Sequence, residues 1–182
     1  MPTPIGHVLG GVAAGWVVAG RATGDRSASR TRARVRFAWG EACLFGALGA
    51  APDLDLLFGA HSTYTHSIGA AALTALIAIL WTRGRHVRMG LACGAAVASH
   101  VLLDWLGSDT TPPIGIMALW PFTREFYQSP FFLFLAISRR WWLTGFYIQN
   151  GAAALRELAI LLPIAATVGL LRTRTASQKQ PR

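Results

Sequence analysis

The stretch ASHVLLDWLGSD, residues 98–109, decides the fold because it places two ionisable side chains in an apolar, helix-length segment. His100 and Asp104 are four residues apart, so on a helix they lie on one face and can bind the same ion. A charged Asp at the centre of a membrane helix costs on the order of 3 kcal/mol, so it requires a partner or water. The stretch therefore predicts a membrane helix that carries part of a polar site.

The composition of the whole chain is that of a membrane protein. Of its 182 residues, 53% are hydrophobic and 14% are charged, well below the usual quarter for soluble domains. Apolar stretches of helix length, which we expect to form helices, occur at residues 4–20, 38–52, 67–82, 89–106 and 154–171. The sequence thus predicts an all-α fold, a polytopic membrane bundle of about five transmembrane helices that forms one domain over residues 1–171. Each stretch is near the short end of the roughly 17 to 25 residues that span a bilayer.

Two further segments have their own expected roles. No positive residue precedes the first apolar stretch, so we expect a retained helix there and not a cleaved signal peptide. The apolar piece SPFFLFLAIS at residues 129–138 is too short to cross a membrane and is followed by RRWW. We expect it to be an interfacial or re-entrant segment with an aromatic anchor.

The positive charge is concentrated in three places. The chain has a formal net charge of +9, and most of its Lys and Arg residues lie in residues 21–36, residues 83–88 and the tail from residue 172. Five spans can be threaded with all three clusters in the cytoplasm, which satisfies the positive-inside rule and makes residues 172–182 a basic cytoplasmic tail. The rule accounts for the charge, so we expect membrane lipids and no nucleic acid as partners. The expected location is a bacterial-type inner or plasma membrane.

On this path, imidazoles and carboxylates come together at the outer, extracytoplasmic ends of the helices. Neutral imidazole nitrogen and carboxylate oxygen are ordinary ligands of zinc and also suit manganese or iron. We therefore predict a site for one or two divalent metal ions, most favourably zinc. The candidate ligands are His7, Asp53, Asp55, His61, His66, His100, Asp104 and Glu157.

Each of these residues also has a simpler explanation. A single histidine such as His7 is often a hydrogen-bonded core residue, and Asp53 or Asp55 could cap a helix or turn. Asp109 fits an Asx turn, and Glu157 could pair with a neighbouring arginine or complement a helix N-terminus. These explanations do not account for the coincidence of all the residues on one side of five helices.

Four short motifs carry a resemblance to a known family. They are PDLD at 52–55, HSTYTHS at 61–67, SHVLLD at 99–104 and GIMALWPF at 115–122. In order and spacing they resemble the YdjM-like family of membrane-bound metal-dependent hydrolases, over roughly residues 4–125. The resemblance implies a helical inner-membrane protein with a hydrolase centre, whose ligand pattern is similar to that of zinc-dependent phospholipases C and single-strand nucleases.

The resemblance also implies how the ligands divide. One Asp of the PDLD pair would surround one metal ion together with His66, His100 and Asp104, and His7 would approach a second ion that shares Asp104. The sequence departs from the family at one point. The family usually reads His-Arg-Gly before Thr-His-Ser, whereas His61 here is followed by Ser and Thr, so an arginine that could clamp an anion is missing. Arg124, just beyond the WPF motif, is a candidate substitute.

These observations favour a metal-dependent hydrolase. We expect hydrolysis of a phosphoester or another lipid-linked or amphiphilic ester at the outer membrane face, through metal-activated water. A carboxylate not fully engaged with metal, Asp53 or Glu157, would accept the proton from water. Two other classes stay open: a metal or proton transporter that uses the same ligands, and a non-catalytic membrane scaffold with a structural metal. The oligomeric state is left open.

Overall fold

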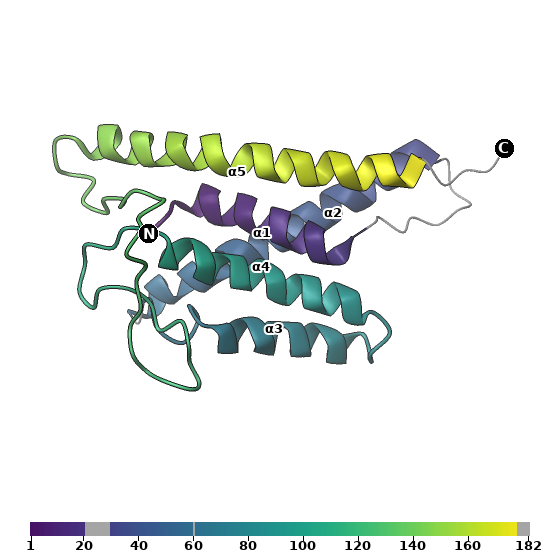
Figure 1. The fold of residues 1–182 in the computed structure, drawn as a ribbon, viewed down its shortest axis with the longest axis horizontal. Coiled ribbons are helices and arrows are strands. Elements are labelled where there is room, and N and C mark those ends of the chain that lie inside the picture. Colours follow the sequence, from purple (N-terminus) through teal and green to yellow (C-terminus); the bar gives the residue numbers. More distant parts are fainter. Residues whose placement is uncertain (21–29, 60, 178–182) are drawn as a thin grey trace.

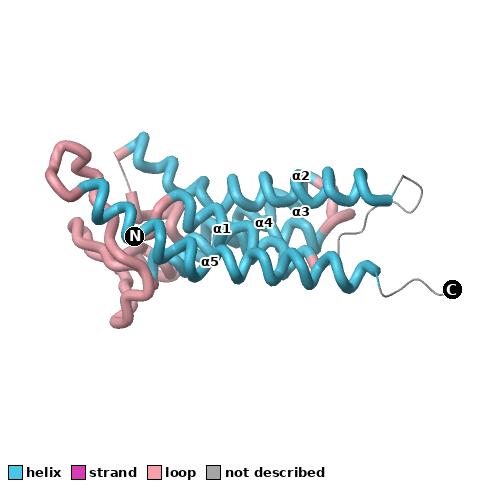
Figure 2. The backbone as a smooth tube through the Cα atoms, turned by 90° about the horizontal axis from the view of Figure 1, so that it is seen from above, coloured by secondary structure: helices cyan, strands magenta, loops and turns pink. Residues whose placement is uncertain are grey.

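The structure is a computed structural model that describes residues 1–20, 30–59 and 61–177, and in this part of the chain it is helical. The elements in chain order are α1 (Pro4–Ala19), α2 (Arg30–Ala50), the 3-10 helix η1 (Ala51–Phe58), α3 (Ile68–Trp81), α4 (Val87–Trp105) and α5 (Phe146–Ser177). The helices run side by side in an elongated bundle (Figure 1), and most of the loop residues gather at one end (Figure 2). The predicted all-α fold is confirmed.

Glycines allow the helices to approach one another closely. α4 contacts α1, α2 and α3, and α1 also contacts α2 and α5. Where α1 crosses α2, a Cβ added at Gly11 would meet the backbone of Phe45, and a Cβ added at Gly49 would meet the backbone of His7. Small residues at such crossings let backbones pack directly, as is common between membrane helices. This crossing brings the end of α2 next to the first turn of α1.

The helix boundaries follow local capping signals. Ser67 accepts a hydrogen bond from the Ala70 amide (3.1 Å) and caps the start of α3. α5 begins at residue 146, eight residues before the predicted start. The apolar pattern missed these first turns because they carry the polar residues Gln149 and Asn150. α2 likewise begins before the predicted residue 38, with a turn of arginines that the hydropathy pattern assigns to a loop.

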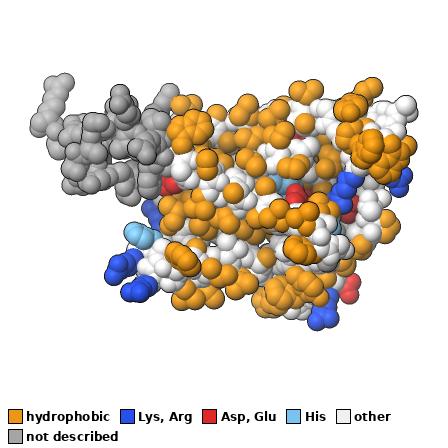
Figure 3. Space-filling view, turned by 180° about the vertical axis from the view of Figure 1, so that it is seen from behind, with side chains coloured by type: hydrophobic (Ala, Val, Ile, Leu, Met, Phe, Trp, Pro, Cys, Tyr) orange, Lys and Arg blue, Asp and Glu red, His pale blue; other side chains and the backbone are white. Residues whose placement is uncertain are grey.

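The expected five full spans are not confirmed. Within the described residues, α4 and α5 are long and apolar enough to cross a membrane, whereas α1 has 16 residues and α3 has 14. At about 1.5 Å per residue, α1 and α3 are roughly 24 Å and 21 Å long, shorter than the hydrocarbon core of about 30 Å. Only 17% of the α5 span is buried inside the protein, so most of this helix faces outward. Figure 3 shows hydrophobic side chains over the middle of one face, with Lys and Arg side chains near its two ends.

The segment at residues 129–138 has no helix and lies across one end of the bundle. Phe134 is 1% exposed and packs against Leu103 and Leu161. Its backbone pairs with the residues that follow α4, through the Ser108 amide, which donates to the Phe134 carbonyl (3.0 Å). The following Trp141 and Trp142 are exposed, as expected for an aromatic anchor.

The described basic residues of the predicted cytoplasmic clusters lie at the end of the bundle opposite to residues 129–138. Residues 83–86 lie in the turn between α3 and α4, which Figure 1 places at the end away from the N-terminus. Arg172 near the end of α5 forms an ion pair with Glu41 of α2 (2.8 Å). The predicted tail therefore begins inside a packed helix. Residues 21–29 of the first cluster and residues 178–182 of the tail lie outside the described residues.

Candidate metal centre

Three histidines and two aspartates meet near the end of the bundle where α4 finishes. Four separate elements supply them: His7 lies in the first turn of α1, Asp53 in η1, His66 just before α3, and His100 with Asp104 in the last turns of α4. The three histidines are 0% exposed and Asp104 is 2% exposed. Asp53 is the most accessible of the five, with 23% of its side chain exposed. We refer to these five residues as the His/Asp cluster.

Four atoms of the cluster are spaced like the ligands of one ion. His100 Nε2 and His66 Nε2 lie 3.1 Å and 3.4 Å from Asp104 Oδ2. The same two nitrogens lie 3.7 Å and 3.6 Å from Asp53 Oδ1. Ligand atoms that are each about 2.0–2.2 Å from a tetrahedral zinc ion lie roughly 3.3–3.6 Å apart. The observed separations therefore suit a zinc-sized ion between the two imidazoles and Asp104, with Asp53 beside it at a slightly greater distance.

The other oxygens of the two carboxylates face His7. His7 Nε2 lies 3.3 Å from Asp104 Oδ1 and 3.9 Å from Asp53 Oδ2. The His7 ring stacks on the His100 ring with a centroid separation of 3.7 Å. Asp104 thus directs one oxygen to the His66 and His100 pair and the other to His7, as a carboxylate shared by two ions would, while the Asp53 oxygens lie farther from the same nitrogens.

Two hydrogen bonds orient the imidazoles. His100 Nδ1 donates to the carbonyl of Gly49 (2.7 Å), which the close crossing of α1 and α2 places beside the cluster. His66 Nδ1 lies 3.1 Å from Asp55 Oδ2. In a neutral ring that donates through Nδ1, Nε2 keeps its lone pair, so both rings direct an acceptor nitrogen into the cluster.

Asp55 supports the cluster from outside. One of its oxygens is 2.8 Å from His61 Nδ1, and the other accepts a hydrogen bond from the Thr65 hydroxyl (2.7 Å) as well as facing His66. With its oxygens engaged in this way, Asp55 positions His66 rather than facing the centre. Metal-bound histidines usually have such a carboxylate behind them. The structure therefore separates the two members of PDLD, with Asp53 facing inward and Asp55 behind.

The buried polar atoms of the cluster provide a test of whether a cation fits. Buried polar groups normally have hydrogen-bond partners. Six atoms of this cluster have none: both ring nitrogens of His7, Nε2 of His66, Nε2 of His100, and both carboxylate oxygens of Asp104. Five of these six are the atoms that face one another across the cluster. The donor set and its unpartnered atoms therefore fit a divalent metal ion.

The pKa values of the cluster residues outside α4 and α5 agree with a cation site. Burial alone would raise the pKa of Asp53, but the contact with His66 and the nearby imidazoles of His100 and His7 hold it below its ordinary value. Asp55 behaves in the same way, because its hydrogen bonds outweigh burial and lower its pKa. Burial would lower the pKa of His66, yet its contacts with Asp53 and Asp55 and the charge of Asp104 raise it to about 9. The negative field that holds a proton on His66 would equally attract a cation.

A family model described as YdjM inner membrane protein matches residues 1–177. The chain belongs to this family. No curated protein and no solved structure matches it. Membership of the YdjM family, together with two helices of spanning length, makes it a membrane protein.

Two other predicted ligands of this YdjM family protein lie at or beyond the edge of the cluster. His61 has its Nδ1 bonded to Asp55, and it forms with Asp53 and His66 a group whose ligand atoms lie within 4.8 Å of one another. Glu157 of α5 is not part of any such group. Its carboxylate accepts hydrogen bonds from the amide (2.8 Å) and the hydroxyl of Thr3, so it anchors the start of α1 and lies apart from the cluster.

Sequence reasoning missed three supporting groups. The Gly49 carbonyl orients His100, Thr65 bonds to Asp55, and Thr3 engages Glu157. A backbone carbonyl leaves no mark in a sequence pattern, although the small residues of α1 and α2 do indicate a close crossing. Nothing in the local sequence shows that Asp55 lies beside Thr65.

Proposed function

We propose that this protein is a membrane-embedded metal-dependent hydrolase that cleaves a phosphoester or another lipid-linked ester at the extracytoplasmic face. The observation that carries the proposal is the spacing of His66 Nε2, His100 Nε2 and the carboxylates of Asp53 and Asp104, at 3.1 to 3.7 Å. Zinc is the ion that this mixture of imidazole and carboxylate suits best, and manganese or iron would also be accepted. The oxygens directed at His7 give room for a second ion.

The residues of the cluster divide the work according to their exposure. A divalent ion held in such a site supplies Lewis acidity and makes water a stronger acid. His66, His100 and Asp104 are buried and would hold the ion. Asp53 has 23% of its side chain exposed and its pKa is lowered, so it is ionised and within reach of solvent. Asp53 is therefore the group that we assign to accept the proton of the attacking water.

The distribution of charge supports an extracytoplasmic site. The turn at residues 83–86 lies at the end of the bundle away from the cluster, and Arg172 bonds to the Gly20 carbonyl at the far end of α1. The positive-inside rule assigns such residues to the cytoplasm. Trp141 and Trp142 are exposed in the loop that leads into α5, on the side of the cluster, where aromatic side chains suit the membrane surface. A site at this depth favours an amphiphilic substrate.

The two rival functions fit the geometry less well. Transporters tend to bind their cargo near the middle of the membrane on broken helices, whereas this cluster includes the last turns of α4 and the first turn of α1. A purely structural metal site would have a closed shell of ligands. The exposure of Asp53 argues for an open side.

The test combines metal analysis with turnover. We expect the detergent-purified protein to contain stoichiometric metal and to hydrolyse at least one of a set of generic phosphomonoester, phosphodiester and lipid ester substrates. His100→Ala should abolish both. The matched control is His86→Ala, because His86 is the exposed histidine at the opposite end of α4. Stoichiometric metal without turnover on any substrate would favour the scaffold, and proton-coupled metal flux in vesicles would favour the transporter.

A further inference from the structure

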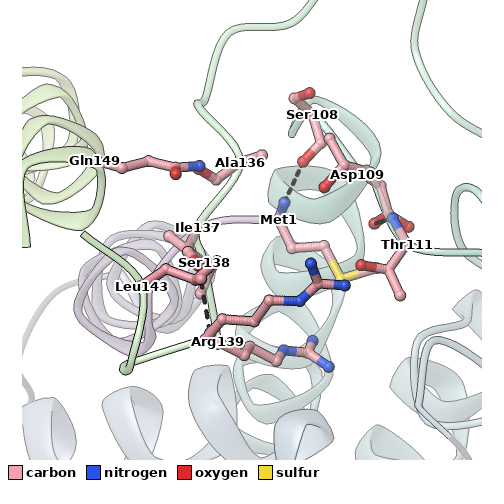
Figure 4. Close-up of a pocket in the computed structure, with 12 residues that line it drawn as sticks. Met1, Ser108, Asp109, Thr111, Ala136, Ile137, Ser138, Arg139, Leu143 and Gln149 are labelled. Atoms are coloured by element: carbon pink, nitrogen blue, oxygen red, sulfur yellow. Dashed lines mark hydrogen bonds between the residues drawn. The ribbon is translucent and has the colours of Figure 1, made fainter. Parts of the chain in front are cut away.

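A cavity of about 430 Å³ lies between the loop that follows α4 and the loop that precedes α5. Figure 4 shows Ser108, Asp109 and Thr111 on one side of it and Ser138 and Arg139 on another. The side chains of Arg139 and Arg140 both line it. We call it the arginine cavity. Its volume is in the range of small-molecule sites, roughly 300–1,000 Å³, and exceeds what a single water or inorganic ion needs.

The wall that carries the arginines is fixed by the first turns of α5. The side chain of Asn150 accepts a hydrogen bond from the Ser138 amide (2.8 Å) and donates one to the Ser138 carbonyl (2.9 Å). Gln149 donates to the Ala136 carbonyl (3.1 Å). The Ser138 hydroxyl in turn accepts from the Arg140 amide (3.3 Å). The backbone on both sides of Arg139 is thus held, which reduces the entropy cost of binding through its side chain.

The charge of the cavity is suited to an anion. Neither Arg139 nor Arg140 forms an ion pair with any residue that the structure describes. The acidic residue of the lining, Asp109, accepts hydrogen bonds from the amides of Thr111 and Gly115 (3.1 Å each), which offset its charge. Two guanidinium groups, each with a planar fork of donors, match the oxygens of a phosphate group.

The arginine cavity is a neighbour of the metal centre. Met1 lines the cavity, and its Sδ lies 3.2 Å from His61 Nε2. Ser108, whose carbonyl accepts a hydrogen bond from the Met1 amino group, follows Asp104 of the His/Asp cluster by four residues. A ligand whose charged group occupies the cavity could therefore extend to the cluster. Arg124, in contrast, does not line the cavity.

We propose that the arginine cavity binds the phosphate group of an amphiphilic ligand through Arg139 and Arg140, beside the metal centre. That this ligand is the substrate rests on the proposed hydrolase function. The missing arginine after His61 is then replaced by two arginines from a distant part of the chain. The exposed Trp141 and Trp142, directly after the pair, would contact the apolar portion of the ligand at the membrane surface.

The test measures binding without turnover. The probe is decylphosphonate, whose carbon–phosphorus bond an ester hydrolase does not cleave, and inorganic phosphate and 1-decanol are compared with it. Calorimetry of the metal-loaded protein in a nonionic detergent would give the dissociation constants. We expect R139Q/R140Q to weaken decylphosphonate binding at least tenfold, and R139K/R140K to weaken it less because the charge remains. R83Q/R85Q is the matched control, since it removes two exposed arginines at the other end of the bundle.

Each outcome decides the proposal. Unchanged binding in R139Q/R140Q, equal loss in R83Q/R85Q, or no phosphonate binding to the wild type would overturn it. Inorganic phosphate bound as tightly as decylphosphonate, or decanol bound as tightly as either, would overturn the assignment to an amphiphilic phosphate. Metal content of every variant is measured in parallel. Arginine-dependent binding that survives in His100→Ala without metal would support the cavity even if the hydrolase proposal fails.

Discussion

Replacing Asp55 by Asn tests whether the residue behind the cluster positions His66. The substitution keeps the size of the side chain but removes its charge and puts an NH2 group where one oxygen was. Asp55 contacts three groups, which are His61 Nδ1, His66 Nδ1 and the Thr65 hydroxyl. The two imidazoles face different oxygens of Asp55, so in Asn one of them meets the NH2 group and loses its acceptor.

The expected loss of metal affinity follows from that lost contact. A hydrogen bond to a charged group contributes about 1.5–3 kcal/mol. If the loss falls on His66, its ring is no longer held with Nε2 towards Asp53 and Asp104, and metal affinity falls by that amount. This corresponds to roughly 10- to 100-fold, the range typical for removing a partner behind a metal-bound histidine. The metal should still bind, because no ligand atom has been removed.

Zinc affinity can be measured by competition with a fluorescent chelator, in detergent and at one pH. The matched control is Asp109→Asn, an aspartate in the loop after α4 that accepts backbone hydrogen bonds and belongs to no candidate ligand group. We expect this control to bind zinc like the wild type. Zinc affinity that is unchanged in Asp55→Asn, or reduced equally in both variants, would refute the positioning role.

Four further predictions test packing, anchoring and metal. Gly49→Ala should lower the free energy of unfolding by about 1–3 kcal/mol in a detergent denaturation assay, because its Cβ would meet the backbone of α1, while Gly40→Ala, with open space around it, should not. Glu157→Ala should lower the free energy of unfolding by about 1–3 kcal/mol, because the buried Thr3 amide loses its partner. The variant should keep the wild-type metal content. Loss of metal would show instead that Glu157 is a ligand. The pKa of His66 is raised to about 9, so without metal this ring is protonated at neutral pH and must lose its proton to bind zinc. The apparent zinc affinity should therefore rise with pH up to about 9 and then level off. A zinc affinity that does not change from pH 6 to 9 would contradict this. Adding zinc to chelator-treated protein at about 1,000 times its dissociation constant should stabilise the fold by about 4 kcal/mol, seen as a higher unfolding temperature, and His100→Ala should show no such shift.

The sequence predicted the helices and the pairing of His100 with Asp104 because both depend on local spacing. The apolar stretches give the five helices, and the four-residue spacing of His100 and Asp104 puts both on one face of α4. The division between Asp53 and Asp55 could not be predicted. Adjacent turns of a short 3-10 helix direct their side chains differently, and only the position of the loop before α3 decides which one faces His66.

Glu157 and the number of spans were harder for a different reason. The position of Glu157 depends on the packing of α5 against the start of α1, which involves residues far apart in the chain. The sequence pattern places Glu157 at the correct end of the bundle but cannot say which group it meets. Whether α1 and α3 cross the membrane depends on their exact lengths, and the apolar stretches are close to the limit.

The position of Asp104 gives a physical reason why this cluster could hold a cation. It is the last residue but one of α4, where the helix dipole is negative and disfavours a carboxylate. The side chain is buried and neither oxygen has a hydrogen-bond partner. The groups nearest to its oxygens are three imidazole nitrogens, at 3.1 to 3.4 Å, which share one small space. A divalent ion satisfies the imidazole nitrogens and the carboxylates together, whereas protons on the imidazoles would place like charges in contact, as between the stacked rings of His7 and His100.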